Sequence, residues 1–297
     1  MIFSYHQVLA QPDPMRPGAV TAERFERQLR WIAQYCNTLP LGEAVERLLA
    51  GRLPERAAAV TFDDGYADNL DVAAPRLQKY GIPAVLFVAV DAVERGIMWN
   101  DVVIEAVRAA RDAIDAGRIG LGVIAVDESN RVAVSRRLIG ALKYRPVAER
   151  MEAALSLYES VSNAPLPRLM LEPARLRELP EAGFEVGAHT VNHPILRLLD
   201  ESAARDEIEG SRVWLTERTG TAPTLFAYPN GKRGDDYDGR HTRIVQELGF
   251  RAAVSTNWGC ATRRSSVYEL PRFKPWEDTA ARFYSRLCKV TARSYLP

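Results

Sequence analysis

Two adjacent carboxylates, Asp63 and Asp64, follow an apolar run and precede Gly65. Successive side chains of a strand point to opposite faces, so two acids at the end of one strand cannot do the same job. One could bind a metal ion while the other takes up a proton. Asp-Gly is also a common hairpin signal, and on this stretch alone a plain turn is an equal alternative.

Two histidines, His189 and His193, lie four residues apart where a second apolar segment ends. Imidazoles at this spacing can converge on one ion, on a helical turn or in a tight loop. A lone histidine is more often structural, but these are two of only four in the chain. The spacing therefore favours a metal site. Pro194 suits the first turn of a helix, which predicts a strand-to-helix junction at His193.

The elements around these residues alternate between strands and helices. Residues 57–62 predict a buried strand, and residues 66–80 a helix that ends at Gly81. Thr21 can cap a second helix. Alternating strands and helices are typical of a parallel sheet covered by helices. The other expected strands are 2–5, 83–90 and 252–256, with a strand-like segment at 184–194 that ends in polar residues, and the other helices are 41–49, 171–179 and 201–219.

Residues 97–170 form a largely helical stretch, with helices expected at 101–116 and 135–161 and a strand signal near 121–126. This insertion could border the site and shape a substrate groove, or it could be structural padding. The proline-rich residues 11–18 follow a predicted strand end, which is a natural position for a substrate loop.

The composition is that of a globular protein of 297 residues, 47% hydrophobic and 26% charged. A net charge of +1 argues against a nucleic-acid partner. No stretch approaches ~18 uninterrupted apolar residues, so we expect no membrane span. The three scattered cysteines suggest a reducing compartment, and the first residues lack a signal-peptide pattern. A cytoplasmic location is therefore expected.

Residues 61–65 (Thr-Phe-Asp-Asp-Gly) and 189–194 (His-Thr-Val-Asn-His-Pro) resemble the first two motifs of the polysaccharide deacetylases, the NodB-homology group or carbohydrate esterase family four. The resemblance extends from about residue 2 to 273. It implies an α/β fold, a distorted, TIM-like (β/α) barrel of about seven parallel strands. We expect residues 1–297 to be a single domain, with the mainly helical insertion at about 95–171.

The resemblance also implies a divalent metal, commonly zinc. Carried over by position, Asp64, His189 and His193 would be the metal ligands and Asp63 the general base. Three protein ligands leave a position open for water and substrate. Bound zinc lowers the pKa of water from 15.7 to about 7 and polarises a carbonyl oxygen, which are the two tasks of amide hydrolysis.

The third family motif is altered at residues 224–231. Ala227 replaces an arginine that orients the base in the family, and Asn230 replaces an aromatic residue. Arg272 is a candidate substitute for that arginine. The turn could still hold an oxyanion with its N–H groups, or it could be a bare surface turn. Its residues are Tyr228, Pro229, Asn230 and Gly231.

The fifth family motif supplies a histidine as general acid, but no histidine follows His241. His6 is the best candidate to replace it, because the first and last strands of a closed barrel are neighbours; structural packing is the alternative. His241 itself is expected to be solvated. Trp258 could wall the acetyl pocket, although a core tryptophan is the commoner explanation.

We therefore expect a metal-dependent hydrolase that removes an acetyl group from the nitrogen of an N-acetylated sugar. The substrate could be a lipid- or nucleotide-linked precursor of a surface polysaccharide. Two alternatives stay open: hydrolysis of another small amide, such as a formamide or ring amide, and a non-catalytic carbohydrate-binding relative. The sequence does not specify the sugar, the chain length, the native metal or the oligomeric state.

Overall fold

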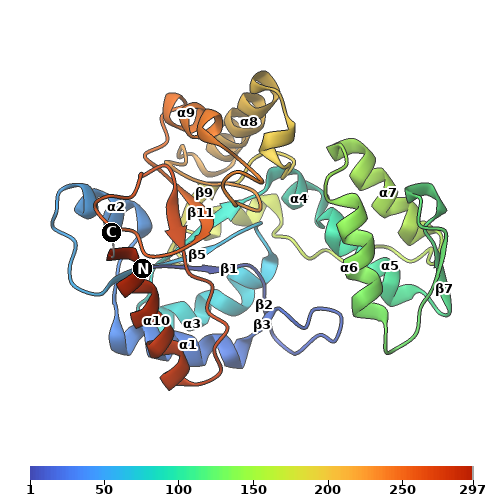
Figure 1. Ribbon diagram of the computed structural model, residues 1–297, viewed down its shortest axis with the longest axis horizontal. Coiled ribbons are helices and arrows are strands. Elements are labelled where there is room, and N and C mark those ends of the chain that lie inside the picture. The colour runs from blue at the N-terminus through green and yellow to red at the C-terminus, as the bar shows by residue number, and fades with distance from the viewer. Residues whose placement is uncertain (296–297) are drawn as a thin grey trace. The chain divides into compact units, whose positions relative to one another are not determined.

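The computed structural model describes residues 1–295 and contains a nearly closed barrel of seven parallel strands with helices outside it (Figure 1). The predicted fold class is therefore confirmed. In spatial order the strands are β1 (Ile2–Tyr5), β5 (Ala57–Phe62), β6 (Ala84–Val88), β9 (Phe184–Ala188), β10 (Leu225–Ala227), β11 (Ala252–Trp258) and β12 (Leu270–Arg272).

The barrel closes between its first and last strands. The Ser4 N–H donates to the Phe273 carbonyl at 2.9 Å, and the Phe273 N–H donates to the Ile2 carbonyl at 2.7 Å. The short strand β4 (Asn37–Thr38) extends the sheet by pairing with β5, whereas β2 (Val8–Leu9) and β3 (Val20–Thr21) form a separate two-stranded sheet. Closure places the residue after β1 beside the end of β12.

Helices cover the outside of the barrel (Figure 1). The Thr21 hydroxyl accepts from the Arg24 N–H and caps the first of them, as predicted. The helix expected at 66–80 begins instead with a π-helical turn, Asn69–Ala73. The helices of the barrel are α1 (Ala22–Tyr35), α2 (Leu41–Leu49), α3 (Ala74–Lys79), α4 (Val90–Arg95), α8 (Glu201–Thr219), α9 (Gly239–Glu247) and α10 (Ala280–Tyr295), with 3-10 turns at Pro173–Glu178 and Leu196–Leu198.

Side chains at every second strand position fill the barrel interior. Ala59, Phe87 and Leu270 belong to one buried cluster, and Leu41 and Val45 of α2 complete it. Phe87 needs a glycine opposite it, because a Cβ at Gly187 would lie only 2.3 Å from the phenyl ring. The barrel interior below the carboxyl ends of the strands is therefore apolar and tightly packed, and it supports those strand ends.

The contacts divide the chain into two compact units. The barrel unit holds residues 1–11, 20–94 and the described residues from 171 on. The second unit holds residues 12–19 and 95–170, so the loop expected at the substrate belongs to the second unit. Its elements are α5 (Trp99–Ala109), β7 (Ala113–Asp115), a 3-10 turn (Gly117–Ile119), β8 (Val123–Ala125), α6 (Arg131–Leu142) and α7 (Val147–Glu159).

Two helix predictions for the insertion are wrong in extent. The helix predicted at 101–116 ends at Ala109, and the hairpin of β7 and β8 follows. The single helix predicted at 135–161 is two helices, α6 and α7, with Pro146 at the cap of the second. Proline lacks an N–H and disfavours a helical residue before it, so the chain turns there.

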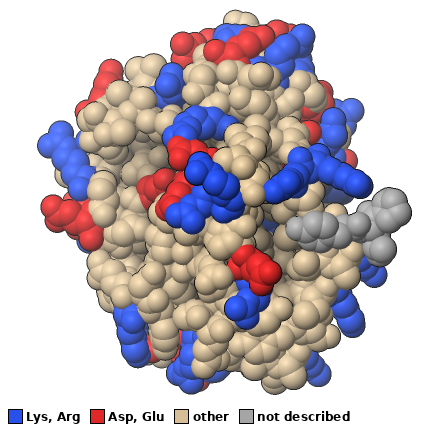
Figure 2. All heavy atoms as spheres, turned by 90° about the vertical axis from the view of Figure 1, so that its left-hand side faces the viewer, with Lys and Arg blue, Asp and Glu red and all other residues tan. Residues whose placement is uncertain are grey.

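Within residues 1–295, none of the helices has both the length and the apolar character of a membrane span. Basic and acidic side chains are intermixed on the face shown in Figure 2, which agrees with the net charge of +1.

Candidate active site at the carboxyl ends of the strands

The alternation of strand side chains brings three polar residues to the top of the barrel interior. Ala59 and Leu270 face the interior cluster, so residues two or four positions further along the same strands face inward as well. These residues are Asp63 and Arg272. By the same rule His6 follows the interior residue Ile2 of β1. The sheet therefore places a carboxylate, a guanidinium and an imidazole in one layer.

Arg272 clamps Asp63 through two hydrogen bonds of 2.7 Å, one to each carboxylate oxygen. Its Nε also donates to the Ser255 carbonyl at 2.8 Å, and Arg272 is only 2% exposed. Burial alone would raise the pKa of Asp63, but the charge and hydrogen bonds of Arg272 hold this pKa well below its ordinary value. Arg272 thus contacts the carboxylate that the missing arginine was expected to orient.

His6 lies with its Nε2 3.9 Å from the Oδ2 of Asp63. Its carbonyl accepts a 2.7 Å hydrogen bond from the Asn69 amide, which fixes the backbone. The Nδ1 atom is buried although the side chain as a whole is 42% exposed. Partial burial and the positive charges of Lys274 and Arg272 outweigh Asp63 and lower the pKa of His6 to about 4. His6 is therefore neutral at pH 7, while Asp63 is ionised.

Asp64 turns away from Asp63 because its backbone is left-handed, with φ of +77°. Non-glycine residues seldom adopt this conformation, and it is often found at functional sites. Gly65 continues the turn at φ of +97°, and a Cβ there would lie 2.9 Å from the Val93 side chain. The two adjacent acids therefore point in different directions, as expected, but the left-handed turn after β5 separates them rather than the alternation of strand side chains.

His189 and His193 stand at the two ends of a tight loop after β9. Thr190 and His193 both have positive φ, +65° and +51°. The Thr190 hydroxyl donates to the His189 carbonyl at 2.5 Å and accepts from the His193 N–H at 3.1 Å. Pro194 is followed by the short 3-10 turn Leu196–Leu198 before α8 begins. The loop geometry, rather than a helical turn, brings the two rings together.

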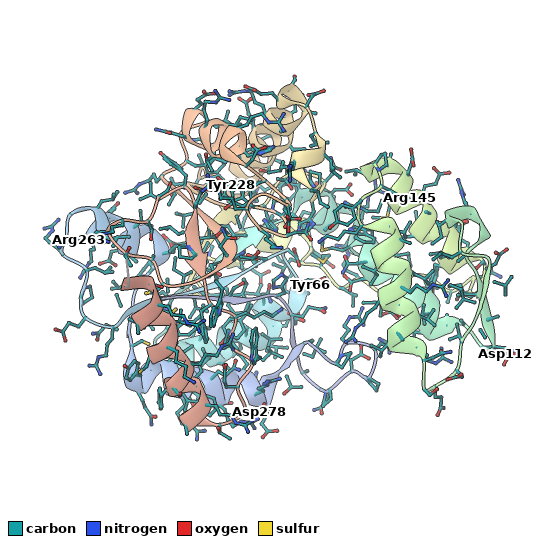
Figure 3. The ribbon with its side chains drawn as sticks, viewed as in Figure 1. Tyr66, Asp112, Arg145, Tyr228, Arg263 and Asp278 are labelled. Carbon is teal, nitrogen blue, oxygen red and sulfur yellow. The ribbon has the colours of Figure 1, made fainter. Side chains whose placement is uncertain are left out.

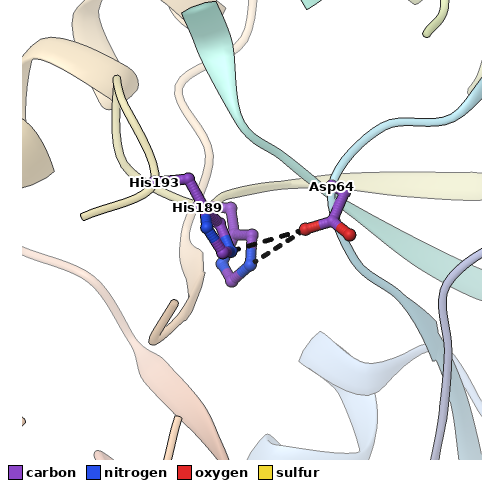
Figure 4. Close-up of side chains that lie close together, drawn as sticks. All are labelled: Asp64, His189 and His193. Atoms are coloured by element: carbon purple, nitrogen blue, oxygen red, sulfur yellow. Dashed lines mark ion pairs between the residues drawn. The ribbon is translucent and has the colours of Figure 1, made fainter. Parts of the chain in front are cut away.

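Both imidazoles face the carboxylate of Asp64 (Figure 4). The Nε2 atoms of His189 and His193 lie 3.6 and 3.5 Å from the Asp64 Oδ1. The His189 Nδ1 lies 2.7 Å from the Ala227 carbonyl, to which it must donate, so the Nε2 lone pair faces the triad. One candidate ligand atom from each residue lies within 4.8 Å of the others.

This donor set fits a divalent ion such as zinc. Two imidazoles and one carboxylate are a common catalytic zinc set, and with bonds of about 2.0–2.1 Å the ligand atoms of a tetrahedral site lie roughly 3.3 Å apart. The distances of 3.5 and 3.6 Å to Asp64 are close to that spacing. Three protein ligands also leave an open position.

Glu207 of α8 holds the histidine loop from outside, and the sequence analysis missed it. Its Oε2 accepts from the N–H groups of Val191 and Asn192 at 3.0 and 2.8 Å. Its Oε1 accepts from the Asn192 side-chain amide at 2.6 Å. Nothing in the local pattern distinguishes Glu207 from its acidic neighbours Asp206 and Glu209.

Tyr228, labelled in Figure 3, was expected to contact substrate, but its side chain is 0% exposed. The ring stacks on Tyr237 with centroids 3.9 Å apart, and the hydroxyl donates to the Tyr268 carbonyl at 3.0 Å. The side chain is therefore part of the core and cannot reach a substrate here.

The turn after Tyr228 offers fewer oxyanion donors than expected. The Tyr228 N–H donates to the Val254 carbonyl, and the Gly231 N–H donates to the Pro229 carbonyl. Pro229 has no N–H, so of these four positions only the N–H of Asn230 has no hydrogen bond to a described backbone carbonyl.

Two other expected side chains lie elsewhere. Trp258 is 47% exposed and packs on Phe273 and Arg286, which belong to neither the triad nor the Asp63 clamp. His241 is 0% exposed, so the expectation that it is solvated is wrong. Its Nδ1 accepts from the Asp238 N–H, and its Nε2 donates to the Leu196 carbonyl. His241 caps α9.

The family model for polysaccharide deacetylases matches residues 50–253. YxkH of Bacillus subtilis (strain 168) is 22% identical over 275 residues, which are 92% of this chain and 70% of YxkH. The poly-beta-1,6-N-acetyl-D-glucosamine N-deacetylase of Staphylococcus epidermidis is 36% identical over 70 residues, 23% of this chain and 24% of that protein.

Among solved structures, the Streptococcus pyogenes deacetylase PplD in complex with acetate is similar in fold. It superposes with a TM-score of 0.64 over 100% of this chain and 97% of that chain, at 18% identity.

Proposed function

Because the chain belongs to the polysaccharide deacetylase family, we propose that it removes the acetyl group from the nitrogen of an N-acetylated sugar residue, with the help of a divalent metal ion. One observation carries the proposal. A carboxylate and two imidazoles face one another at the end of the barrel where Arg272, Asp63 and His6 also meet. Asp64, His189 and His193 would hold the ion.

A divalent ion such as zinc, when bound there, would polarise the amide carbonyl and lower the pKa of water. Asp63, kept ionised and oriented by Arg272, accepts the proton of the attacking water. His6 is neutral before the reaction and lies within reach of the proton that Asp63 receives. His6 takes up this proton from Asp63 and delivers it to the departing nitrogen as the carbon–nitrogen bond breaks. The products are acetate and a free amine.

The substrate class rests on similarity. The Staphylococcus epidermidis protein is named for an N-acetylated glucosamine polymer, which supports a sugar amide as the substrate here. A lipid- or nucleotide-linked precursor of a surface polysaccharide is an alternative form of the same substrate.

We also propose a cytoplasmic location. Immunoblots of cytosol, membrane and culture medium from cells expressing the full-length protein test it.

The test measures acetate and free amine released from a panel of N-acetylated glycans and small formamides and ring amides. Purified protein is assayed after treatment with a chelator and again after zinc is restored, beside Asp63→Asn and the exposed control Glu209→Gln. We expect the wild type to release acetate and amine from a glycan. The chelator should stop this release and zinc should restore it. Asp63→Asn should lose the release, whereas Glu209→Gln should keep it.

Two results contradict the proposal. Release that survives full removal of divalent ions would contradict metal dependence. Metal binding with no release from any compound, while glycans still bind, would identify a non-catalytic carbohydrate-binding relative.

A further inference from the structure

Two tryptophans are exposed beside the catalytic strands and have no role in the chemistry above. Trp258 is 47% exposed and Trp276 is 57% exposed. Trp258 ends β11 and pairs in register with Arg272 of β12, and Trp276 follows shortly after Arg272 in the chain. Exposed large aromatic side chains that lie together are a mark of a binding surface.

Arg286 of α10 holds these rings in place. Its guanidinium carbon lies 3.4 Å from the ring centre of Trp276, 4.6 Å from that of Phe273 and 5.2 Å from that of Trp258. Arg286 also pairs with Glu277, whose other oxygen accepts from the Trp276 N–H at 3.1 Å. We call Trp258, Phe273, Trp276 and Arg286 the aromatic platform. Its geometry is fixed before any ligand arrives, which lowers the entropic cost of binding.

A cavity of about 660 Å³ adjoins the platform and α10. The acids that line it are already paired, Glu277 with Arg286 and Asp278 with Arg24. The cations Arg282, Lys289 and Arg293 also line it, are exposed, and form no ion pair within residues 1–295. The cavity therefore offers flat aromatic faces together with uncompensated positive charge.

We propose that the aromatic platform binds the glycan strand of the substrate beyond the residue being deacetylated, and that this strand carries acidic groups. The proposal rests on the proposed function. Sugar rings present flat C–H faces that pack on indole, and carboxylate or phosphate groups suit the cations. The platform adjoins the site from the outer side of the barrel, because Trp258 pairs in register with Arg272, which binds Asp63.

The test measures binding of two N-acetylated oligosaccharides of equal length by calorimetry. One is a hyaluronan oligosaccharide, which alternates glucuronic acid with N-acetylglucosamine, and the other is an uncharged chitin oligosaccharide. Variants Trp276→Ala, Trp276→Phe and Lys289→Glu are compared with two controls. Trp214→Ala removes a tryptophan that stacks on Arg218 of α8, and Arg137→Glu reverses an exposed charge on α6.

We expect the anionic oligosaccharide to bind about tenfold more tightly than the uncharged one, and more weakly as salt rises. Trp276→Ala should weaken binding about tenfold, a difference of about 1.4 kcal/mol, while Trp276→Phe keeps most of it. Lys289→Glu should abolish the preference for the acidic strand. Both control variants should bind like the wild type.

Equal binding by wild type and a folded Trp276→Ala would overturn the proposal, and so would tighter binding of the uncharged strand. Self-association that Trp276→Ala abolishes, seen by light scattering, would instead make this surface an interface between copies of the chain. Calorimetry does not depend on catalysis. The expected binding pattern without acetate release would contradict only the proposed function, whereas release without this pattern would contradict only the platform.

Discussion

The buried pair of Arg272 and Asp63 explains how this chain keeps the carboxylate that we propose as the general base ionised without an arginine at position 227. The Arg272 guanidinium belongs to the last strand, β12, and both of its terminal nitrogens donate to Asp63. At position 227 the backbone carbonyl has a different task, since it accepts from His189 of the triad. One substitution in a motif is thus compensated by a residue far away in the sequence.

Arg272→Met should lower the free energy of unfolding by about 3–5 kcal/mol, because it leaves the charge of Asp63 buried and unpaired. Urea unfolding measures this loss. The double variant Asp63→Asn with Arg272→Met removes both charges. Its loss of unfolding free energy should be smaller than the sum of the losses in the two single variants. Additive losses would mean that the pair is not coupled.

His6 and His193 should separate proton transfer from metal binding. His6→Ala should lower kcat about 10²–10⁴-fold, because a placed acid or base typically contributes that much, and should leave the metal content unchanged. His193→Ala should lose the metal. Elemental analysis after dialysis, together with acetate release, checks both variants. Loss of metal in His6→Ala would make His6 a ligand instead.

At the scale of elements, α8 supports the triad through one residue. Glu207 accepts hydrogen bonds from three N–H groups of the loop between the two histidines, which ties this loop to α8. The strained backbone at Thr190 and His193 can persist only where such contacts determine it.

Glu207→Ala should weaken metal binding about 10–100-fold, since residues that orient ligands contribute about that much. Competition with a chromophoric chelator measures the affinity. Glu209→Ala on the same helix should bind metal like the wild type, because Glu209 is exposed. Equal affinity in both variants would show that the loop holds its shape without Glu207.

The second unit has its own charged anchor for residues 12–19. Arg16, only 7% exposed, pairs with Asp13, Asp101 and Glu105. Burial raises the pKa of Asp13, but hydrogen bonds from Arg108, the Met15 N–H and Arg16 lower it more, to about 2. The loop predicted to contact substrate is therefore tied to α5 by ion pairs.

This pKa predicts how the stability changes with pH. The unfolded-state pKa of Asp13 is about 3.9, so its contribution is fully present above that value. It should be lost as the pH falls from about 4 to about 2. At pH 7 the unfolding free energies of wild type and Asp13→Asn should differ by about 1 kcal/mol, because the ion pairs of Asp13 are partly exposed. This difference should shrink as the pH falls from about 4 to about 2. A difference that is constant with pH would contradict the assignment.

At the scale of the whole barrel, closure assembles the site from both ends of the chain. His6 follows the first strand and Arg272 ends the last one, and both lie beside Asp63. The hydrogen bonds between Ser4, Phe273 and Ile2 hold these strands together. Catalysis should therefore depend on closure.

Ser4→Pro should destabilise the protein by about 3 kcal/mol and lower the deacetylation rate, because proline removes the N–H that donates to Phe273. Thermal unfolding and acetate release measure both effects. Ser4→Ala keeps this N–H and should be close to the wild type in rate. A Ser4→Pro variant with full activity would show that closure by this bond is not needed.

The sequence alone determined most of the local elements and the candidate metal-binding triad. The apolar run at 57–62, the cap at Thr21 and the alternation of side chains are set by neighbours in the chain, so local patterns predict them. The two motifs contain Asp64, His189 and His193 at fixed spacing, which made the triad recognisable before its geometry was seen.

Tertiary structure decided the contacts between distant segments. Only barrel closure shows that Arg272 clamps Asp63 and places His6 3.9 Å away. Only packing shows that Tyr228 and His241 are buried and that Glu207 faces the histidine loop. A residue type permits each of these roles, but whether it faces core, site or solvent depends on elements from other parts of the chain. Local periodicity carries no information about those partners, so they had to be seen in the fold.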